Sequence, residues 1–215
     1  MKSIIISAFS GTGKSYLTKN VKKAQYRLPG TGVTIHPKFH DSDSSKYSWI
    51  YDEDGNKTDQ RDPNFPDNYM EHIRSLMEED GNIIFVSTHE SVREALIKAG
   101  FSFYIIRPAL HLRDQYLENY RKRGSSEEFI DLIDKNWIRF LTDIDKFQNM
   151  HMENVTLVEL RKDVYMEQAI SILARIGFLA SPSRVIIYSE SNQMIEAMED
   201  GSIMIKSKNE IKEDN

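Results

Sequence analysis

Residues 8 to 15 combine glycine, lysine and serine in a spacing that suits the binding of phosphate groups. They read Ala-Phe-Ser-Gly-Thr-Gly-Lys-Ser and match the pattern G-x-x-x-x-G-K-[ST], except that Ala8 replaces the first glycine. Their backbone N–H groups can surround one phosphate, the Lys14 ammonium can reach the β- and γ-phosphates of a nucleotide, and the Ser15 hydroxyl can bind Mg²⁺. We therefore expect a site for ATP and Mg²⁺ formed by Ser10, Gly11, Thr12, Gly13, Lys14, Ser15 and Tyr16.

Two carboxylates follow the second strand that we expect, at residues 33–35. Asp41 and Asp43 are separated by one residue, in a stretch rich in Asp and Ser. A carboxylate within hydrogen-bond reach assists transfer to a hydroxyl group, whereas a phosphate acceptor needs positioning and charge neutralisation. A solvated turn is the alternative explanation. His36 and His40 have no further ligands at a suitable spacing, so we interpret them as loop residues rather than metal ligands.

Basic residues gather after the fourth expected strand, at residues 103–106. Arg113 and Arg121 are about two helical turns apart, and Arg123 follows within a basic cluster that ends at Gly124. Guanidinium groups suit phosphate oxygens, so we expect these three arginines to neutralise the transferring phosphoryl group. A solvated, charged helix face is the alternative. Arg93 and Arg139 are further candidates for contacts with the acceptor.

The third expected strand, at residues 83–86, ends without the aspartate of a Walker B motif. Ser87 stands there and could hold a Mg²⁺-bound water, or Asp41 could supply the missing carboxylate. Glu90 could activate a water, or it could form a helix capping box with Ser87. The missing aspartate disfavours an ATPase or motor, and the lack of an Asn-Lys-x-Asp motif disfavours a GTPase switch.

Aromatic residues cluster around the stretch that follows the Asp pair. Stacking on a base would explain them, and so would the packing of a long loop on the domain. Tyr47 and Trp49 are the first candidates for stacking because they follow Asp43 directly. The full group is Tyr47, Trp49, Tyr51, Phe65 and Tyr69.

The elements that must position these residues alternate along the chain. Short runs that are apolar on both faces predict parallel strands at residues 3–7, 33–35, 83–86, 103–106 and 155–158. Helical spacing predicts helices at 16–23, 66–80, 87–97, 125–144 and 162–176, of which the third and fourth would open with capping boxes at Ser87/Glu90 and Ser125/Glu128. Parallel neighbours need crossover connections, so the prediction is an α/β, three-layer P-loop domain with a five-stranded parallel sheet.

The composition changes after Gly177. We expect a main domain at residues 1–178 and a small β-α-β appendage at 179–205, with strands at 185–188 and 203–205 and a helix at 192–198. The charged tail at 206–215 is predicted to be disordered.

The overall composition excludes several classes of protein. The 215 residues contain 28 Lys and Arg, 33 Asp and Glu, and no cysteine, with a net charge of −5. Disulfides, a thiolate nucleophile and a Cys-bound zinc are therefore excluded. The acidic balance disfavours a nucleic-acid coat protein, and no apolar run suits a membrane span or a signal peptide. We expect a cytoplasmic protein, in the host cytoplasm if the chain is viral. The sequence leaves open whether the protein forms a homodimer.

The motifs and the order of elements resemble the small P-loop kinases of the nucleoside monophosphate kinase and shikimate kinase group, over residues 1–178. Asp41 and Asp43 are similar to the Asp-x-Asp of shikimate-type kinases, and the arginines resemble the lid of these enzymes. The resemblance implies that Asp41 lies near Mg²⁺ and the attacking oxygen and that Asp43 contacts the acceptor. The chain also resembles small deoxynucleotide kinases of bacteriophages.

The resemblance implies transfer of the γ-phosphoryl group of ATP to a nucleotide-type acceptor, a (deoxy)nucleoside monophosphate in first place. We expect the acceptor to contact Asp43, Tyr47, Trp49 and Arg93. One alternative is a hydroxyl acceptor, either a hydroxymethylated pyrimidine, free or in DNA, or a small polyol acid. Nucleic acid would then be a partner only as a modified-base substrate. The other alternative is a non-catalytic NTP-binding module.

Overall fold

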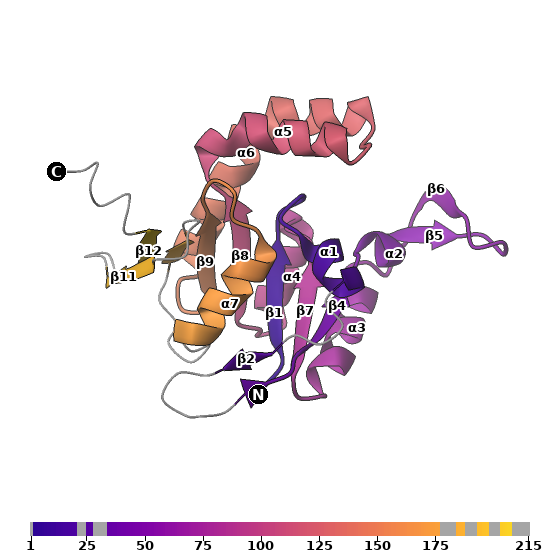
Figure 1. Ribbon diagram of the computed structural model, residues 1–215. Coiled ribbons are helices and arrows are strands. Elements are labelled where there is room, and N and C mark those ends of the chain that lie inside the picture. Colours follow the sequence, from indigo (N-terminus) through magenta and orange to yellow (C-terminus); the bar gives the residue numbers. More distant parts are fainter. Residues whose placement is uncertain are drawn as a thin grey trace.

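Five parallel strands form the centre of the molecule. The computed structural model describes residues 2–20, 25–27, 34–176, 184–187, 193–197 and 203–207. The central strands are β1 (Ile4–Ala8), β4 (Lys38–Asp41), β7 (Asn82–Val86), β8 (Phe103–Pro108) and β9 (Val155–Leu160). They lie side by side in the order β9-β8-β1-β7-β4 (Figure 1). The predicted five-stranded parallel sheet is therefore confirmed.

Helices cover both faces of this sheet, because its central strands are apolar on both sides. On β1, Ile5 belongs to one core cluster and Ile6 to the other. One face carries α3 (Asp67–Met77), α4 (Glu90–Lys98), the 3₁₀ turn η1 (Leu110–Leu112), α5 (Arg113–Lys122) and α6 (Glu127–Met150). The other face carries α1 (Lys14–Asn20) and α7 (Met166–Ile176). This arrangement confirms the three-layer α/β prediction.

The second strand of the sheet is not where the sequence predicted it. Thr34 and Ile35 form β3 (Thr34–Ile35), which pairs antiparallel with β2 (Tyr26–Arg27) in a separate hairpin, while Val33 lies outside the described residues. The sheet strand is β4, which pairs with β7, and Phe39 stacks on Phe85 at 5.8 Å. The prediction placed the strand at the more apolar residues 33–35, but the pairing with β7 is made by the following run, Lys38–Asp41.

Two predicted capping boxes are wrong. The N-cap of α4 is His89, without a side-chain hydrogen bond, and the Ser87 hydroxyl instead accepts a hydrogen bond from Ser44. The N-cap of α6 is Ser126, whose side chain accepts from the Phe129 N–H. In both places a serine pattern near a helix start was assigned one or two residues too early, as is common for helix ends.

The C-terminal segment is built from strands and extends the same sheet. β10 (Arg184–Ile187) pairs parallel with β9, β12 (Ile203–Ser207) pairs parallel with β10, and β11 (Gln193–Ala197) pairs antiparallel with β12. The predicted helix at 192–198 is therefore wrong, and the β-α-β appendage is a strand addition that completes an eight-stranded sheet. A short helix is marginal by itself, whereas a strand gains main-chain hydrogen bonds from its neighbour. Residues 208–215 of the predicted tail lie outside the described residues, and the domain boundary near 178 stays a prediction.

A hairpin projects from the body between β4 and α3 (Figure 1). It follows the short helix α2 (Ser45–Ser48) and consists of β5 (Trp49–Tyr51) and β6 (Lys57–Arg61), joined by a turn in which Asp52 accepts hydrogen bonds from two backbone N–H groups. We call residues 49–61 the arm. The stretch that the sequence left irregular is thus partly ordered.

Candidate functional site

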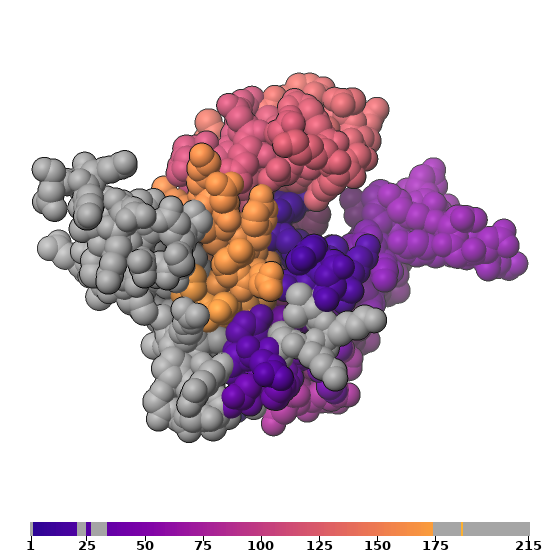
Figure 2. All heavy atoms as spheres, in the orientation of Figure 1, coloured from indigo at the N-terminus to yellow at the C-terminus, as the bar shows by residue number. Residues whose placement is uncertain are grey.

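The candidate site lies where the parallel strands end. β1 lies between β7 and β8, and the chain passes from β1 toward β4 on one side and later to β8 on the other. Such a change of direction leaves a crevice at the carboxyl ends of the strands, which is where α/β proteins bind ligands. Residues 8–15, which we call the glycine loop, leave β1 at this crevice. Figure 2 shows a hollow between the start of α1, the α5–α6 pair and the arm.

The glycine loop is held in an unusual conformation. Gly11 has φ +80° and Gly13 has φ +109°, values that residues other than glycine rarely adopt. A Cβ on Gly11 would lie 2.8 Å from the ring of Tyr120, whose hydroxyl donates a hydrogen bond to the Ser10 carbonyl. Tyr120 therefore packs directly on the loop from α5, and only glycine fits beneath it.

The loop has backbone donors available for a ligand. Within the part of the chain that the structure describes, the N–H groups of Gly11, Gly13, Lys14 and Ser15 have no hydrogen-bond acceptor. Thr12 differs, because its N–H and hydroxyl both donate to the Phe9 carbonyl and its side chain is buried. Free N–H groups at glycine turns are anion binders, so the predicted phosphate nest has the required geometry, with the Thr12 side chain supporting the loop.

Lys14 extends back along the loop. Its ammonium donates to the Ala8 carbonyl at 2.7 Å and to the Phe9 carbonyl at 3.4 Å. Burial lowers the pKa of Lys14 to about 8, and the nearby Asp41 and Asp43 oppose this shift. Among the described residues Lys14 has no carboxylate in an ion pair, so its charge is available to phosphate oxygens.

Ser15 and Asp41 meet as the resemblance implies. The Ser15 hydroxyl donates to a carboxylate oxygen of Asp41 at 2.7 Å. Oxygen ligands suit Mg²⁺, which proteins often hold with one or two side chains together with substrate phosphates. Ser15 and Asp41 together offer two such oxygen ligands. Among the described residues, no group of three or more His, Cys, Asp or Glu side chains could hold a metal ion. Asp43, in contrast, is exposed and accepts from the Ser45 N–H in a turn.

A cavity of about 340 Å³ opens on one side of the glycine loop. Its walls come from the loop, α1 and the start of α7, and Tyr16 is 61 % exposed at its edge. Tyr165 is fixed there by a hydrogen bond from Asn119. The lining residues are Gly11, Gly13, Tyr16, Leu17, Tyr165, Met166, Glu167 and Gln168. We call this the smaller cavity.

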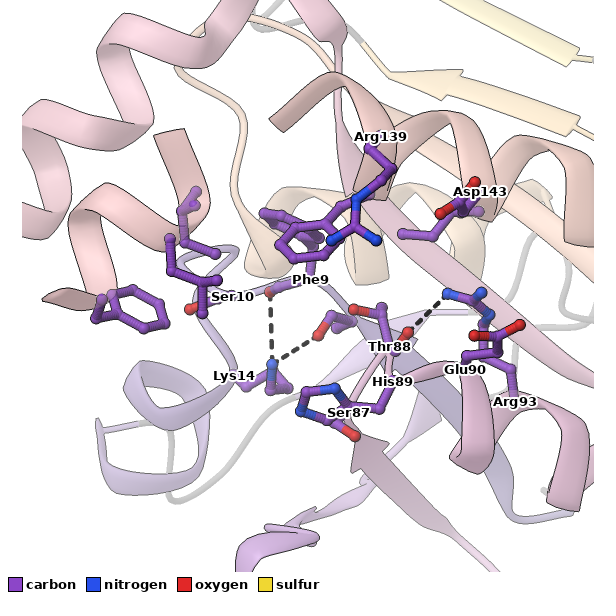
Figure 3. Close-up of a pocket in the computed structure, with 16 residues that line it drawn as sticks. Phe9, Ser10, Lys14, Ser87, Thr88, His89, Glu90, Arg93, Arg139 and Asp143 are labelled. Atoms are coloured by element: carbon purple, nitrogen blue, oxygen red, sulfur yellow. Dashed lines mark hydrogen bonds between the residues drawn. The ribbon is translucent and has the colours of Figure 1, made fainter. Parts of the chain in front are cut away.

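A cavity of about 460 Å³ opens on the other side of the loop, and we call it the larger cavity. Lys14 and Arg93 lie at opposite ends of it, with the residues after β7 between them (Figure 3). One group of lining residues is apolar: Ala8, Phe9, Phe129, Leu132, Ile133, Phe140 and Ile144. The other group is polar or charged: Ser10, Lys14, Ser87, Thr88, His89, Glu90, Arg93, Arg139 and Asp143.

Arg93 is a buried cation in this cavity. It is 5 % exposed, donates to the Thr88 carbonyl at 2.7 Å, and lies 4.9 Å from the ring centre of Phe147. Its Nε has no hydrogen-bond acceptor among the residues that the structure describes. Burial lowers the pKa of Arg93, while Glu90 and Asp143 act in the opposite direction. An incompletely paired guanidinium in a cavity suits an anionic ligand, and the contact of Arg93 with an acceptor stays a prediction.

The three predicted lid arginines have different surroundings. Arg123 donates to the Ser10 hydroxyl at 3.4 Å and lies 4.5 Å from the ring centre of Tyr120, so it reaches the glycine loop. Arg113 forms ion pairs with Asp114 and Asp134, and Arg121 forms one with Glu118. The structure thus brings Arg123 to the loop, whereas the contacts that it describes for Arg113 and Arg121 are elsewhere.

The two predicted stacking residues already have partners. The Tyr47 ring packs against Tyr69 at 5.1 Å and against His72 at 4.9 Å, so the packing explanation fits it better. Trp49 lies under two cations of the arm, Lys57 at 4.0 Å and Arg61 at 3.9 Å from its ring centre. Neither ring is an open platform for a base.

Sequence reasoning missed four residues of this region. Tyr120 contacts the glycine loop, Tyr165 lines the smaller cavity, and His89 lines the larger one. Arg61 is the fourth, because its charge contributes to lowering the pKa of His89. His89 could have been found, because it follows the Ser87 that was considered for a Walker B role. The other three reach the site through folding alone, and no local spacing marks them.

Comparisons with protein-family models, with curated proteins and with solved structures found no match to this chain. No helix in the described ranges is long and apolar enough to cross a membrane. A functional assignment therefore rests on the chemistry of the site. The arrangement can bind a chain of phosphates at the glycine loop and hold two organic groups on either side of it.

Proposed function

We propose that this chain is an ATP- and Mg²⁺-dependent phosphotransferase of the small P-loop kinase type, with a nucleotide as phosphoryl acceptor. The acceptor that we place first is a (deoxy)nucleoside monophosphate. One observation carries the proposal, namely that the glycine loop forms a wall of both cavities. A nucleotide on the free N–H groups of the loop, with its nucleoside in the smaller cavity, would present its γ-phosphate to the larger one.

The cations around the loop supply the charge that transfer requires. Lys14 would exchange the carbonyl oxygens of Ala8 and Phe9 for oxygens of the β- and γ-phosphates. Arg123, which already contacts Ser10, would add a second positive charge on the same side. Donors fixed in advance stabilise charge that develops during transfer without reorganising.

The chemical step breaks the bond between the γ-phosphorus and the oxygen that bridges it to the β-phosphate, and it forms a bond to an acceptor oxygen. The bridging oxygen leaves with the electron pair as part of ADP. A monophosphate acceptor attacks with an oxygen that is already anionic, so no base has to remove a proton. Ser15 and Asp41 would hold Mg²⁺, which would supply positive charge for the phosphate groups.

The larger cavity suits a nucleotide acceptor in size and chemistry. Ligand cavities commonly enclose about 300–1,000 Å³, and this one combines an aromatic wall with fixed cations. Phe129 and Phe140 can pack on a base, and Arg93 can bind a phosphate. These features support the monophosphate acceptor over an acceptor without charge.

A hydroxyl acceptor is the second candidate, and Glu90 favours it. This residue lines the larger cavity, and the structure gives it no capping role at the start of α4. A carboxylate in that place can take the proton of an attacking hydroxyl group. A hydroxymethylated pyrimidine, free or in DNA, or a small polyol acid would then be the acceptor.

An ADP-release screen with Mg²⁺-ATP tests the proposal against nucleosides, nucleoside monophosphates, polyol acids and hydroxymethylated DNA. We expect one or a few monophosphates to stimulate ADP release far above the rate without acceptor. Stimulation by hydroxyl acceptors alone would replace the first candidate by the second. ATP binding that depends on Lys14, with no stimulation by any acceptor, would support a non-catalytic NTP-binding module instead.

A further inference from the structure

The base of the arm is tied to the candidate site. The Asp62 N–H donates to the Ser48 carbonyl at 3.3 Å, which closes the hairpin where it meets the body. Just before α2, the Ser44 hydroxyl donates to the Ser87 hydroxyl at 3.1 Å. Ser87 lines the larger cavity, two residues before His89. The arm therefore leaves the body at the edge of this cavity.

A stacked pair at the base of the arm fixes one guanidinium. Trp49 and Arg61 are opposite each other in the β5–β6 pairing, and the guanidinium carbon of Arg61 lies 3.9 Å from the centre of the Trp49 ring. Stacking on an aromatic face restrains an arginine and leaves the N–H groups along its edge able to donate. Arg61 has no carboxylate in an ion pair within the described ranges. The N–H groups of the Arg61 guanidinium are thus fixed in orientation and available to a ligand.

His89, which lines the larger cavity, has Arg61 among the charges that act on its pKa. The pKa of His89 is lowered by burial first, and then by Arg61, Arg93 and Lys14, in that order, while Asp43 opposes them. Lys14 and Arg93 line the same cavity as His89, and Arg61 at the base of the arm adds a third positive charge to the surroundings of His89. Such a group of cations in an acidic protein indicates a site for an anion.

We infer that Arg61 binds an anionic oxygen group of the acceptor at the mouth of the larger cavity, and that Trp49 is the positioning residue that holds Arg61 there. The group is a phosphate or a carboxylate, since both match the planar donors of a guanidinium. This inference rests on the proposed function, because it assigns the larger cavity to the acceptor. It also gives Trp49 a role other than base stacking.

Steady-state kinetics with an acceptor from the screen test the role of both residues. We expect Arg61→Gln to raise the KM for the acceptor about tenfold or more, with kcat and the KM for ATP changed less than about threefold, as for loss of a charged hydrogen bond in binding. Trp49→Leu should raise the same KM, and Trp49→Phe should largely restore it. Lys57→Gln is the matched control, because Lys57 lies over the same ring, and it should leave the acceptor KM unchanged.

Tryptophan emission tests the anion site without catalysis. Inorganic phosphate and acetate are titrated in separate arms against the protein without ATP, and we expect at least one to change the emission of Trp49 with saturation. The change should be absent in Arg61→Gln and Trp49→Phe and present in Lys57→Gln. Trp137 is buried and serves as the constant background. Phosphate and acetate distinguish the two kinds of anion.

The outcomes separate this inference from the proposed function. Equal behaviour of Arg61→Gln and Lys57→Gln in both assays would overturn the inference even if ADP is released, as would a wild-type emission that neither anion changes. An emission change that requires Arg61, together with no ADP release for any acceptor, would keep the anion site and remove the kinase. Unchanged melting temperatures of the variants exclude misfolding as the cause.

Discussion

The arginines of α5 differ from Arg93 and Arg61 in what neutralises them. Arg113 and Arg121 are exposed, and each has a carboxylate of α5 or α6 in an ion pair. Arg93 and Arg61 are held by a main-chain oxygen and by an aromatic ring, respectively, and neither has a carboxylate partner among the described residues. The sequence predicted site roles for Arg113, Arg121 and Arg93, but it gave no signal for Arg61.

From this difference we expect that the partner of a cation is a better guide to its function than its spacing along a helix. An exposed ion pair contributes about 0–1 kcal/mol, and its charge is already balanced. A guanidinium held by a carbonyl or a ring keeps its charge for a ligand. Substitutions of single residues test this comparison, and the expected effects range from large at Lys14 to small on α5.

The largest effect is expected at Lys14, the cation that the glycine loop holds with two carbonyl groups. Lys14→Met should reduce the rate of ADP release by roughly 10²–10³-fold, as removal of one preorganised donor to developing charge does in other enzymes. Lys122→Met is the control, because Lys122 is exposed and pairs with Glu118 on α5. Equal rates for both variants would contradict a catalytic role for the loop.

Arg93→Met should weaken acceptor binding and leave the fold intact. Loss of hydrogen bonds from a charged group costs about 1.5–3 kcal/mol, so the acceptor KM should rise roughly ten- to hundredfold. A buried cation without a full set of partners is itself unfavourable, so we expect a melting temperature that is equal or higher. A large drop in melting temperature with a normal KM would instead make Arg93 a structural residue.

The affinity for ATP should depend on pH through Lys14. Its pKa in the free protein is lowered to about 8, so the ammonium is charged below this pH and loses its proton above it. Bound phosphates favour the charged form, and affinity should therefore fall by up to about tenfold per pH unit above pH 8. Lys14→Arg keeps its charge, so calorimetric titrations at pH 7 to 9.5 should show a flat profile for this variant.

The contribution of Lys14 to the free energy of unfolding should rise with pH, whereas the affinity for ATP falls. Between about pH 8 and the ordinary lysine pKa of 10.5, the unfolded chain holds a proton on Lys14 that the folded protein has lost. The unfolded state then binds more protons, so the contribution of Lys14 to stability rises with pH in this window. Urea unfolding of the wild type and of Lys14→Met across pH 7 to 10 measures it as a difference.

The smallest effects are expected on α5. Arg113→Ala and Arg121→Ala each remove an exposed ion pair, and we expect changes in stability below about 1 kcal/mol and in ADP release below about threefold. A loss of activity comparable to that of Lys14→Met would show that these arginines leave their carboxylates during catalysis. That result would support the lid that the resemblance implies.

Much of the fold could be predicted because its signals are local. The apolar strands β1, β7, β8 and β9 and the loop after β1 follow from short runs of sequence. The pairing of β4 could not be predicted, because Lys38–Asp41 is less apolar than the neighbouring residues 33–35 and gains its place through contact with β7. The strand at Gln193–Ala197 likewise depends on its partner β12.

Local sequence signals likewise predict one part of the candidate site and not the other. The glycine loop and the Ser15–Asp41 contact follow from a motif and from the order of strands. The contact of Tyr120 with Gly11 and that of Tyr165 with Asn119 join residues far apart in sequence. Such contacts are set by how helices and hairpins pack, and a single sequence contains no local signal for them.

The projection of the arm has a consequence for how such a protein can diversify. Residues 49–61 contribute little to the two core clusters, so insertions, deletions and substitutions there cost the fold little. The glycine loop has no such freedom, because Tyr120 leaves no room above Gly11. Under the proposed function, descendants of one ancestor could therefore change the acceptor by remodelling a single hairpin while keeping the glycine loop unchanged.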